Sequence, residues 1–345
     1  MSKILFIGDL NQYGRGYQRY RTLLEMGHEV VGFSHTDISA PGVIEHPSLT
    51  YRLFWKLRFP LDTTGVNAFL RSSVSNSTFD VIWIEKGNMI RPATLVAIKK
   101  MIGLDAKVIS CSEDDMYARH GHSYFYRLGL RHYHCVFTTK TYNLTELKTF
   151  GAQETKLFLD SYDEVVHRPV TLSREDIDEY SCDVGAIGAF EEQRARSLLF
   201  LARNGIEVNI WGNGWGDWVG RHPLLRVRNK FLFGLEYAKA ISATKVNLNF
   251  LRKINRDEVT SRSVEIPACR GFMLAERTQR HQSFFKEGEE AEFFDSNEEL
   301  LMKTEIYLRE ASRRRALADA GFKRCLISGY SMRSQLSNIL NHLGH

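Results

Sequence analysis

The feature that most constrains the fold is a recurrence of short apolar runs, rich in β-branched residues, that alternate with stretches of helical spacing. Helical stretches such as YQRYRTLLEM and PATLVAIKKMIG separate the runs. In the first half of the chain the runs lie at 4–8, 29–33, 81–85, 107–110 and 135–139. Because these runs are apolar on both faces, they predict the strands of a parallel sheet that helices cover on both sides.

The same pattern begins again in the second half. Strands are predicted at 183–188, 208–212, 245–250, 271–276 and 291–295. Charge and proline interrupt the periodicity at 166–178, where we place the boundary between two doubly wound α/β domains, 1–168 and 169–329. From Asn297 onward the sequence predicts two helices. A break at SGYS allows the last helix, 330–345, to fold back on the first domain.

Composition narrows the class of protein. Hydrophobic residues make up 43% of the 345 residues and charged residues 25%, which is typical of a folded globular chain. A net charge of +5 without dense basic clusters favours anionic ligands and argues against a nucleic-acid partner. Five cysteines without CxxC spacing argue against a disulfide framework or a zinc cluster. With no signal-peptide or membrane-spanning segment in the sequence, we expect a cytoplasmic protein, and nothing indicates its oligomeric state.

The stretch TSRSVEIPACRGF, at 260–272, is the strongest candidate for a ligand site. It places Arg262 and Glu265 one turn apart at a predicted helix start, with Ser261 as the N-cap. Free backbone amides attract a diphosphate, Arg262 can bind its oxygens, and Glu265 can accept hydrogen bonds from two sugar hydroxyls. The competing interpretation is an ordinary surface helix with a weak ion pair between these two residues.

Loops that follow other predicted strands also carry candidates. In the second half, Gly188 and Arg194 follow a strand, and the tryptophans of WGNGWGDW are predicted to pack in a core or domain interface. The loop after the first strand contains a polar and glycine-rich set: Asp9, Asn11, Tyr13, Gly14, Arg15 and Gly16. It lacks the third glycine of GxGxxG, which disfavours a hydride-transfer enzyme. An ordinary β-turn is the alternative for this loop.

The loop after the run at 107–110 presents acids and imidazoles. Asp114, Asp115 and His122 are candidates for a general base or for orienting sugar hydroxyls. The alternatives are solvated loop charges and a divalent metal held by the histidine pairs at 120 and 122 or at 132 and 134.

The segment RLFWKLRFP, at 52–60, alternates basic with bulky apolar residues. It predicts a packed helix whose charged groups reach solvent. Peripheral contact with an anionic membrane surface is the second interpretation.

Over most of its length the chain resembles the CgeB-like family of bacterial glycosyltransferases. The similar segments are GDLNQYGRGYQRYRTLLEMGHEV, DVIWIEKGNMIRPATLVAIKK, SEDD, VFTTKTYNLTEL, DVGAIGAFEEQR, KVNLNF, SRSVEIPACRGFMLAE, FFDSNEELLMK and RRALADAGFKR. The run from Ser261 is the most specific of them. Asp257 stands where the family's first motif glutamate falls, and Arg270 stands where relatives usually have a glycine-rich turn.

The resemblance implies a GT-B fold, in which two Rossmann-like domains face each other across a cleft. The N-terminal domain would present the acceptor, with Asp9, Asn11, Tyr13 and Gly14 on that side. The C-terminal domain would bind a nucleotide diphosphate sugar, such as a UDP-sugar, as the co-substrate, and Glu265 would contact the ribose. Its implied donor-binding residues are Gly188, Arg194, Asn249, Ser261, Arg262 and Glu265.

The resemblance further implies a transferase that needs neither a bound metal nor a cofactor. Its acceptor would be a glycan, a protein or a small molecule, and a role in cell-surface glycan synthesis fits this activity. An inverting enzyme would use Asp114, Asp115 or His122 as the base, whereas a retaining enzyme can use the leaving diphosphate. A nucleotide-sugar 2-epimerase of the same fold and a non-catalytic sugar-nucleotide-binding scaffold are the alternatives.

Overall fold

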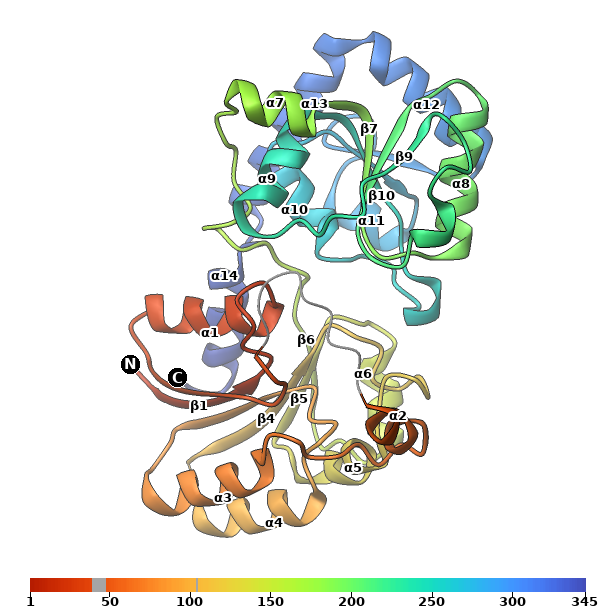
Figure 1. Ribbon diagram of the computed structural model, residues 1–345. Helices are drawn as coiled ribbons and strands as arrows, with labels where there is room; N and C mark the ends of the chain where they lie inside the picture. Colours follow the sequence, from red (N-terminus) through yellow and green to blue (C-terminus); the bar gives the residue numbers. More distant parts are fainter. Residues whose placement is uncertain (39–47, 104) are drawn as a thin grey trace. The chain divides into compact units, whose positions relative to one another are not determined.

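The computed structural model describes residues 1–38, 48–103 and 105–345 (Figure 1). The chain divides into two compact units, Met1–Leu159 with Arg333–His345, and Asp160–Met332. The boundary that the sequence suggests, between 168 and 169, lies inside the second unit. Tyr162 explains why: its N–H donates to the carbonyl of Tyr330 at 3.0 Å, and its carbonyl accepts from Met332 N–H at 2.8 Å.

The first unit is built on a six-stranded parallel sheet with the strand order β2-β1-β3-β4-β5-β6. Leu5 pairs with Val31 of β2 on one side and with Ile82 of β3 on the other, so the strand order reverses between β1 and β3. The strands are β1 (Lys3–Gly8), β2 (Glu29–Ser34), β3 (Val81–Glu85), β4 (Lys107–Ser112), β5 (Cys135–Thr138) and β6 (Thr155–Leu157).

Helices cover both faces of this sheet, as the apolar runs predict. Helices α1 and α14 lie on one face, and α3 and α4 lie on the other (Figure 1). On the second face, Leu70 and Leu95 join Ile82 in one buried cluster. The helices are α1 (Arg15–Glu25), α2 (Leu49–Lys56), α3 (Val66–Asn76), α4 (Pro92–Met101), α5 (Tyr124–Gly129), η1 (Leu130–His132), α6 (Asn143–Thr149) and α14 (Met332–His342).

The second unit repeats the architecture with the strand order β12-β11-β10-β7-β8-β9, which reverses between β7 and β10. The strands are β7 (Cys182–Ile187), β8 (Val208–Trp211), β9 (Leu225–Val227), β10 (Thr244–Asn249), β11 (Met273–Glu276) and β12 (Glu292–Phe294). The helices are α7 (Arg174–Tyr180), α8 (Glu192–Arg203), η2 (Gly216–Trp218), α9 (Gly234–Ala243), η3 (Lys253–Asn255), α10 (Arg262–Ala268), α11 (Gln279–Phe284), α12 (Asn297–Arg309) and α13 (Ala311–Ile327).

The core of the second unit lies mainly under α8 and α12, while α9 and α10 cover the opposite face of the sheet (Figure 1). Trp215 and Trp218 are buried in this core, as predicted. Trp215 Nε1 also donates to the carbonyl of Gly188 at 2.9 Å, so the loop after β8 supports the loop after β7.

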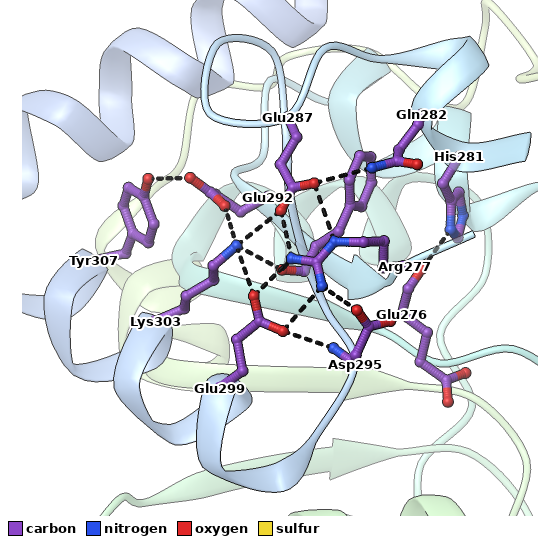
Figure 2. A network of polar contacts seen from close by, with 11 residues as sticks. Glu276, Arg277, His281, Gln282, Glu287, Glu292, Asp295, Glu299, Lys303 and Tyr307 are labelled. Carbon is purple, nitrogen blue, oxygen red and sulfur yellow. Dashed lines mark hydrogen bonds and ion pairs between the residues drawn. The ribbon is translucent and has the colours of Figure 1, made fainter. Parts of the chain in front are cut away.

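A network of charged side chains fixes α12 beside the end of β11 (Figure 2). Arg277 binds Glu287 at 2.5 Å and Glu299 at 2.6 Å, and it also contacts Asp295. Lys303 lies 2.9 Å from Glu287. Hydrogen bonds from Arg277 lower the pKa values of Glu287 and Glu299 to about 2.

The region after Asn297 contains three helices in place of the two that the sequence predicts. Glu310, with φ −89° and ψ 64°, separates α12 from α13. The surrounding sequence YLREASRRRA has no glycine or proline, so no local signal marks this break.

Helix α2 also differs from its prediction, because none of its residues is buried. The expected packing against a core is therefore wrong for the helical part of 52–60, up to Lys56, whereas Phe59 stacks on Tyr124 with ring centres 5.0 Å apart and Pro60 is buried. Within the described residues, no helix has both the length and the apolarity that a membrane crossing requires.

Candidate functional site

The reversal between β7 and β10 marks the place in the second unit where a ligand is expected. In open α/β sheets, the loops at the carboxyl ends of the strands diverge at such a point and leave a crevice. Gly188 follows β7, and Phe250 follows β10. Arg194, from α8, is 5% exposed and donates to the carbonyl oxygens of Ala189 and Phe250. One guanidinium therefore ties the two loops together.

A second guanidinium, that of Arg262, lies beside the first. A Cβ atom added to Gly188 would be 2.7 Å from Arg194 Nη1 and 3.5 Å from Arg262 Nη1. Burial lowers the pKa of Arg194 to about 10, and the charge of Arg262 adds to this effect. In the part of the chain that the structure describes, neither arginine forms an ion pair with a carboxylate. Two like charges held together in this way favour the binding of an anion between them.

Glu265 lies one turn after Arg262 and is 7% exposed. Tyr237 Oη donates to its Oε2 at 2.8 Å, and His167 Nε2 lies 3.8 Å from its Oε1. All residues of α10 after Arg262 are buried, which contradicts the alternative of an ordinary surface helix. No local sequence pattern connects Tyr237 or His167 with this site, because they lie 28 and 98 positions from Glu265.

Ser261 occupies the N-cap position of α10, but its side chain makes no capping bond. Its φ of −54° and ψ of −35° are already helical, whereas a capping side chain requires extended backbone. Its carbonyl accepts from Val264 and Glu265 N–H instead, at 3.0 and 2.9 Å. Ser261 is therefore the N-cap that the sequence predicts, but it lacks the side-chain bond that usually accompanies this position.

Asn249 lies at the end of β10 and is completely buried. Its Nδ2 donates to Ser263 Oγ at 2.9 Å, and Ser263 Oγ lies 2.7 Å from His281 Nε2. His281 Nδ1 donates to the carbonyl of Glu276 at 2.7 Å, which leaves Nε2 to accept from Ser263. Burial lowers the pKa of His281 to about 4, so the ring is neutral near pH 7. Asn249 thus helps to hold α10 in place.

Asp257 and Arg270, the two residues that differ from the pattern of the CgeB-like family, both bind neighbouring side chains. Asp257 Oδ1 accepts from Asn255 Nδ2 at 2.7 Å. Arg270 has a positive φ of 60°, as a turn glycine would, and its guanidinium binds Asp319 of α13. Arg270 therefore supplies the turn after α10 and an attachment to α13.

In the first unit, the loop after β1 is held by its own polar side chains. Asp9 Oδ1 accepts from Asn11 Nδ2 at 2.7 Å and from Thr36 Oγ1 at 2.9 Å. Gly14 N–H donates to the carbonyl of Asn11 at 2.7 Å, which forms the turn that was the alternative interpretation. Tyr13 is half-buried in the same loop. The structure brings these four residues together and uses Asp9 and Asn11 to shape the loop.

The predicted acids after β4 have different environments. Asp114 is partly exposed and lies 2.5 Å from Lys86 Nζ. Asp115 is fully buried, and its Oδ1 accepts from Tyr117 N–H and Ala118 N–H at 3.1 Å and from Asn143 Nδ2 at 3.0 Å. The structure therefore places Asp115 inside the loop that it stabilises, where this carboxylate faces the chain instead of a substrate.

His122 is also buried, at 5% exposure. Its Nδ1 donates to the carbonyl of Ala118 at 3.0 Å, and its Nε2 accepts from Arg58. Burial and the charge of Arg58 lower the pKa of His122 to about 4. The lone pair that a general base needs is therefore engaged by Arg58.

The histidine pairs at 120 and 122 and at 132 and 134 do not form a metal cluster in the described part of the chain. The grouping of possible ligands found there is Cys135, Glu154 and His342, whose ligand atoms lie within 4.8 Å of one another. All five cysteines are free and buried.

The fold and one family model connect the chain with known proteins. A family described as glycosyl transferase-like matches residues 193–341. No curated protein sequence matches the chain. Sucrose-phosphate synthase from Thermosynechococcus elongatus is similar over 99% of both chains, with a TM-score of 0.69 and 13% identity.

Two further solved structures are similar over 100% of both chains. They are Anabaena HepE in complex with UDP and glucose, with a TM-score of 0.66 and 13% identity, and an alpha-glucosyltransferase in complex with UDP-glucose and DNA, with a TM-score of 0.67 and 11% identity. The whole chain therefore has the two-domain α/β fold of GT-B glycosyltransferases, and its residues 193–341 carry the pattern of a glycosyl transferase-like family.

Proposed function

We propose that this protein is a glycosyltransferase that moves a sugar from a nucleotide diphosphate sugar to a glycan, a protein or a small molecule. The observation that carries the proposal is the pair Arg194 and Arg262 at Gly188, which has no carboxylate partner in the described structure. Both arginines lie within the residues that match the family model. UDP bound to Anabaena HepE and UDP-glucose bound to the alpha-glucosyltransferase support a UDP-sugar as the donor.

The main requirement of the proposed reaction is a site that stabilises the negative charge of the leaving diphosphate. An acceptor hydroxyl oxygen attacks the anomeric carbon, the bond from that carbon to the diphosphate oxygen breaks, and the diphosphate leaves with the electron pair. The acceptor proton passes to a base or to the leaving phosphate. Arg262 and Arg194 would neutralise the negative charge that develops on the diphosphate, and Glu265 would accept hydrogen bonds from the ribose. In this scheme the arginines supply the charge that a metal ion supplies in other transferases.

We place the chain nearest to the CgeB-like enzymes on the strength of the segment from Ser261 to Glu276. Five free, buried cysteines are compatible with a cytoplasmic reaction, where nucleotide sugars are available. Synthesis of cell-surface glycans is the role that we propose for such an enzyme.

The Arg262→Ala variant tests the donor site. We expect isothermal titration to show micromolar binding of one of UDP, GDP and dTDP to the wild type, unchanged by EDTA. A charge-assisted hydrogen bond contributes about 1.5–3 kcal/mol, so the variant should bind roughly ten- to a hundred-fold more weakly. Arg226→Ala is the matched control, because Arg226 is an exposed arginine of the same unit that pairs with Glu207. Equal affinity of the wild type and Arg262→Ala would contradict the proposal.

Substitutions at Glu265 test the ribose contact. Glu265→Gln keeps one acceptor oxygen, so it should retain more nucleotide affinity than Glu265→Ala. Each variant is titrated with the nucleotide that the wild type binds. Indistinguishable affinities for the wild type and both variants would exclude a ribose role for Glu265.

Product analysis separates the two alternatives from the proposed transferase. A 2-epimerase would release an isomerised or hydrolysed sugar without any acceptor, and a scaffold would bind UDP without turnover. Proton NMR of the protein with a UDP-sugar, with and without added acceptors, distinguishes these cases, since only a transferase links UDP release to a new glycosidic bond.

A further inference from the structure

The first unit contains a cavity of about 800 Å³ beside helix α2. Tyr51, Arg52, Trp55 and Lys56 line it from α2, and the loop that precedes α5 lines the other side. The remaining lining residues are Arg58, Arg119, His120, His122 and Ser123. Four of these nine residues are arginine or lysine, and none is aspartate or glutamate. Among the described lining residues, the arginine and lysine charges are therefore not balanced by any acidic side chain.

Among the described residues, the cations of this cavity have no acidic ion-pair partners. Arg52, Lys56, Arg58 and Arg119 form no ion pair with any residue that the structure describes. Arg58 is held in place, because its guanidinium lies 4.4 Å from the centre of the Tyr124 ring and also donates to His122. With one cation oriented and three others unpaired, the cavity has a positive potential that attracts an anion.

Aromatic rings connect this cavity with the carboxyl edge of the sheet. Tyr51 and Trp55 line both the large cavity and an adjoining one of about 120 Å³. The smaller cavity is also lined by His35 and Lys86, which directly follow β2 and β3. A ligand in the large cavity would thus extend toward the edge where ligands of such sheets bind.

We propose that this cavity binds the phosphate group of a phosphorylated acceptor, with Trp55 packing against a ring or chain of the same molecule. Arginine binds phosphate oxygens in pairs, and several cations suit a doubly charged phosphate better than a single carboxylate. The assignment of this ligand as the acceptor rests on the proposed transferase function. Phosphate recognition by the cavity does not depend on it.

Phenyl phosphate is a suitable probe because it joins a phosphate to a ring. Trp55 is 37% exposed, whereas Trp83, Trp211, Trp215 and Trp218 are at most 4% exposed, so tryptophan fluorescence reports on the cavity. We expect the wild type to bind phenyl phosphate and the Arg52→Ala, Lys56→Ala double variant to bind it at least tenfold more weakly. Since α2 has no buried residue, these substitutions leave the core intact.

A double variant of exposed cations elsewhere in the same unit, Arg71→Ala with Lys100→Ala, is the matched control and should bind phenyl phosphate like the wild type. Equal binding to the wild type and to Arg52→Ala, Lys56→Ala would overturn the proposal, as would equal binding of neutral phenol and phenyl phosphate. UDP titration of the same proteins tests the donor site separately from the phosphate-binding cavity. Absence of UDP binding with intact phenyl phosphate binding counts against the donor site alone.

Vesicles identify the source of the phosphate. Leu49 and Leu53 of α2 are 81% and 55% exposed and are not among the residues that line the cavity. A lipid-linked acceptor predicts binding to phosphatidylglycerol vesicles but not to phosphatidylcholine vesicles, with loss of vesicle binding in Leu49→Ser, Leu53→Ser and unchanged phenyl phosphate affinity. Phenyl phosphate binding without vesicle binding indicates a soluble phosphorylated acceptor.

Discussion

Gly188 controls how closely the two arginines of the proposed donor site approach the chain. Its missing side chain leaves room for Arg194 Nη1, which would lie 2.7 Å from an added Cβ atom. The neighbouring Gly212 is needed for a different reason, since a Cβ atom there would lie 2.2 Å from the carbonyl oxygen of Gly188. Both glycines therefore allow close packing in the region where the loops after β7 and β8 meet.

A Gly188→Ala substitution should weaken binding of the donor nucleotide roughly tenfold, because the added methyl group displaces the guanidinium of Arg194 and one charge-assisted hydrogen bond contributes about 1.5–3 kcal/mol. Isothermal titration with UDP measures the effect. Gly216→Ala is the control, since a Cβ atom there meets nothing within 4 Å. If both variants bind like the wild type, Arg194 does not act on the nucleotide.

Among the helices and strands, α10 is the part of the proposed donor site that depends most on its neighbours. It has seven residues, too few for a stable helix on its own, and it relies on the buried chain of hydrogen bonds from Asn249 through Ser263 to His281. The positions of Arg262 and Glu265 therefore depend on buried side chains behind the helix.

Replacing His281 with alanine should lower both stability and nucleotide affinity. The change leaves Ser263 Oγ and the carbonyl of Glu276 without their partner, which costs about 1–3 kcal/mol, or several degrees in the unfolding temperature. Thermal unfolding and UDP titration measure the two effects. His222→Ala, at a half-buried histidine of the same unit, is the control. Unchanged UDP affinity in His281→Ala would show that α10 keeps its position without this support.

The ion-pair network that fixes α12 should reveal itself in the pH dependence of stability (Figure 2). Arg277 lowers the pKa values of Glu287 and Glu299 to about 2. Their contribution to the free energy of unfolding is therefore complete above the usual glutamate pKa of 4.5, and it is lost as the pH falls from 4.5 toward 2. The difference in unfolding temperature between the wild type and Arg277→Met should therefore shrink between pH 6 and pH 3. A constant difference would mean that Arg277 stabilises α12 by packing alone.

Considering the whole molecule, both units contain buried histidines that stay neutral near pH 7 because their pKa values are lowered. The pKa values of His35 and His122 in the first unit and of His281 in the second are lowered to about 4, mainly by burial. A histidine with a lowered pKa binds its proton more readily in the unfolded chain. Its stabilising contribution is complete above the usual value of 6.5 and is lost as the pH falls from 6.5 toward 4.

The protein should therefore lose stability between pH 7 and pH 5, before carboxylates of ordinary pKa are protonated. Calorimetric unfolding at pH 7, 6 and 5 measures this, and two units allow two transitions. The variants His122→Gln and His281→Asn should each show a smaller fall in unfolding temperature between pH 7 and pH 5. An unfolding temperature that stays constant from pH 7 to pH 5 would contradict the neutral state of these rings.

Much of the fold could be predicted from particular stretches of sequence. The runs at 4–8 and 81–85 became β1 and β3, and the run at 183–188 became most of β7, because strands buried on both faces are continuously apolar. The edge strands β6 and β9 have three residues each, too few to show a period. The break at Glu310 escaped prediction because no helix-breaking residue marks it.

Prediction of the candidate site was most successful where the chemistry is local. The spacing of Arg262 and Glu265 led to the helix that the structure places at the reversal between β7 and β10. Tyr237, His167 and His281 could not be found in this way, because each reaches α10 from a distant part of the sequence. The burial of Asp115 was missed for the same reason, since its partner Asn143 lies 28 positions away.

The sequence by itself determined two parallel sheets covered by helices, since apolar periodicity is a local property of the chain. Three features depend on the tertiary structure: which polar side chains are buried, which two arginines meet at Gly188, and that α2 borders a cavity whose described charged lining residues are arginine and lysine. The physical reason is that burial and charge pairing depend on neighbours in space. Those neighbours come from segments whose order along the chain does not record their proximity.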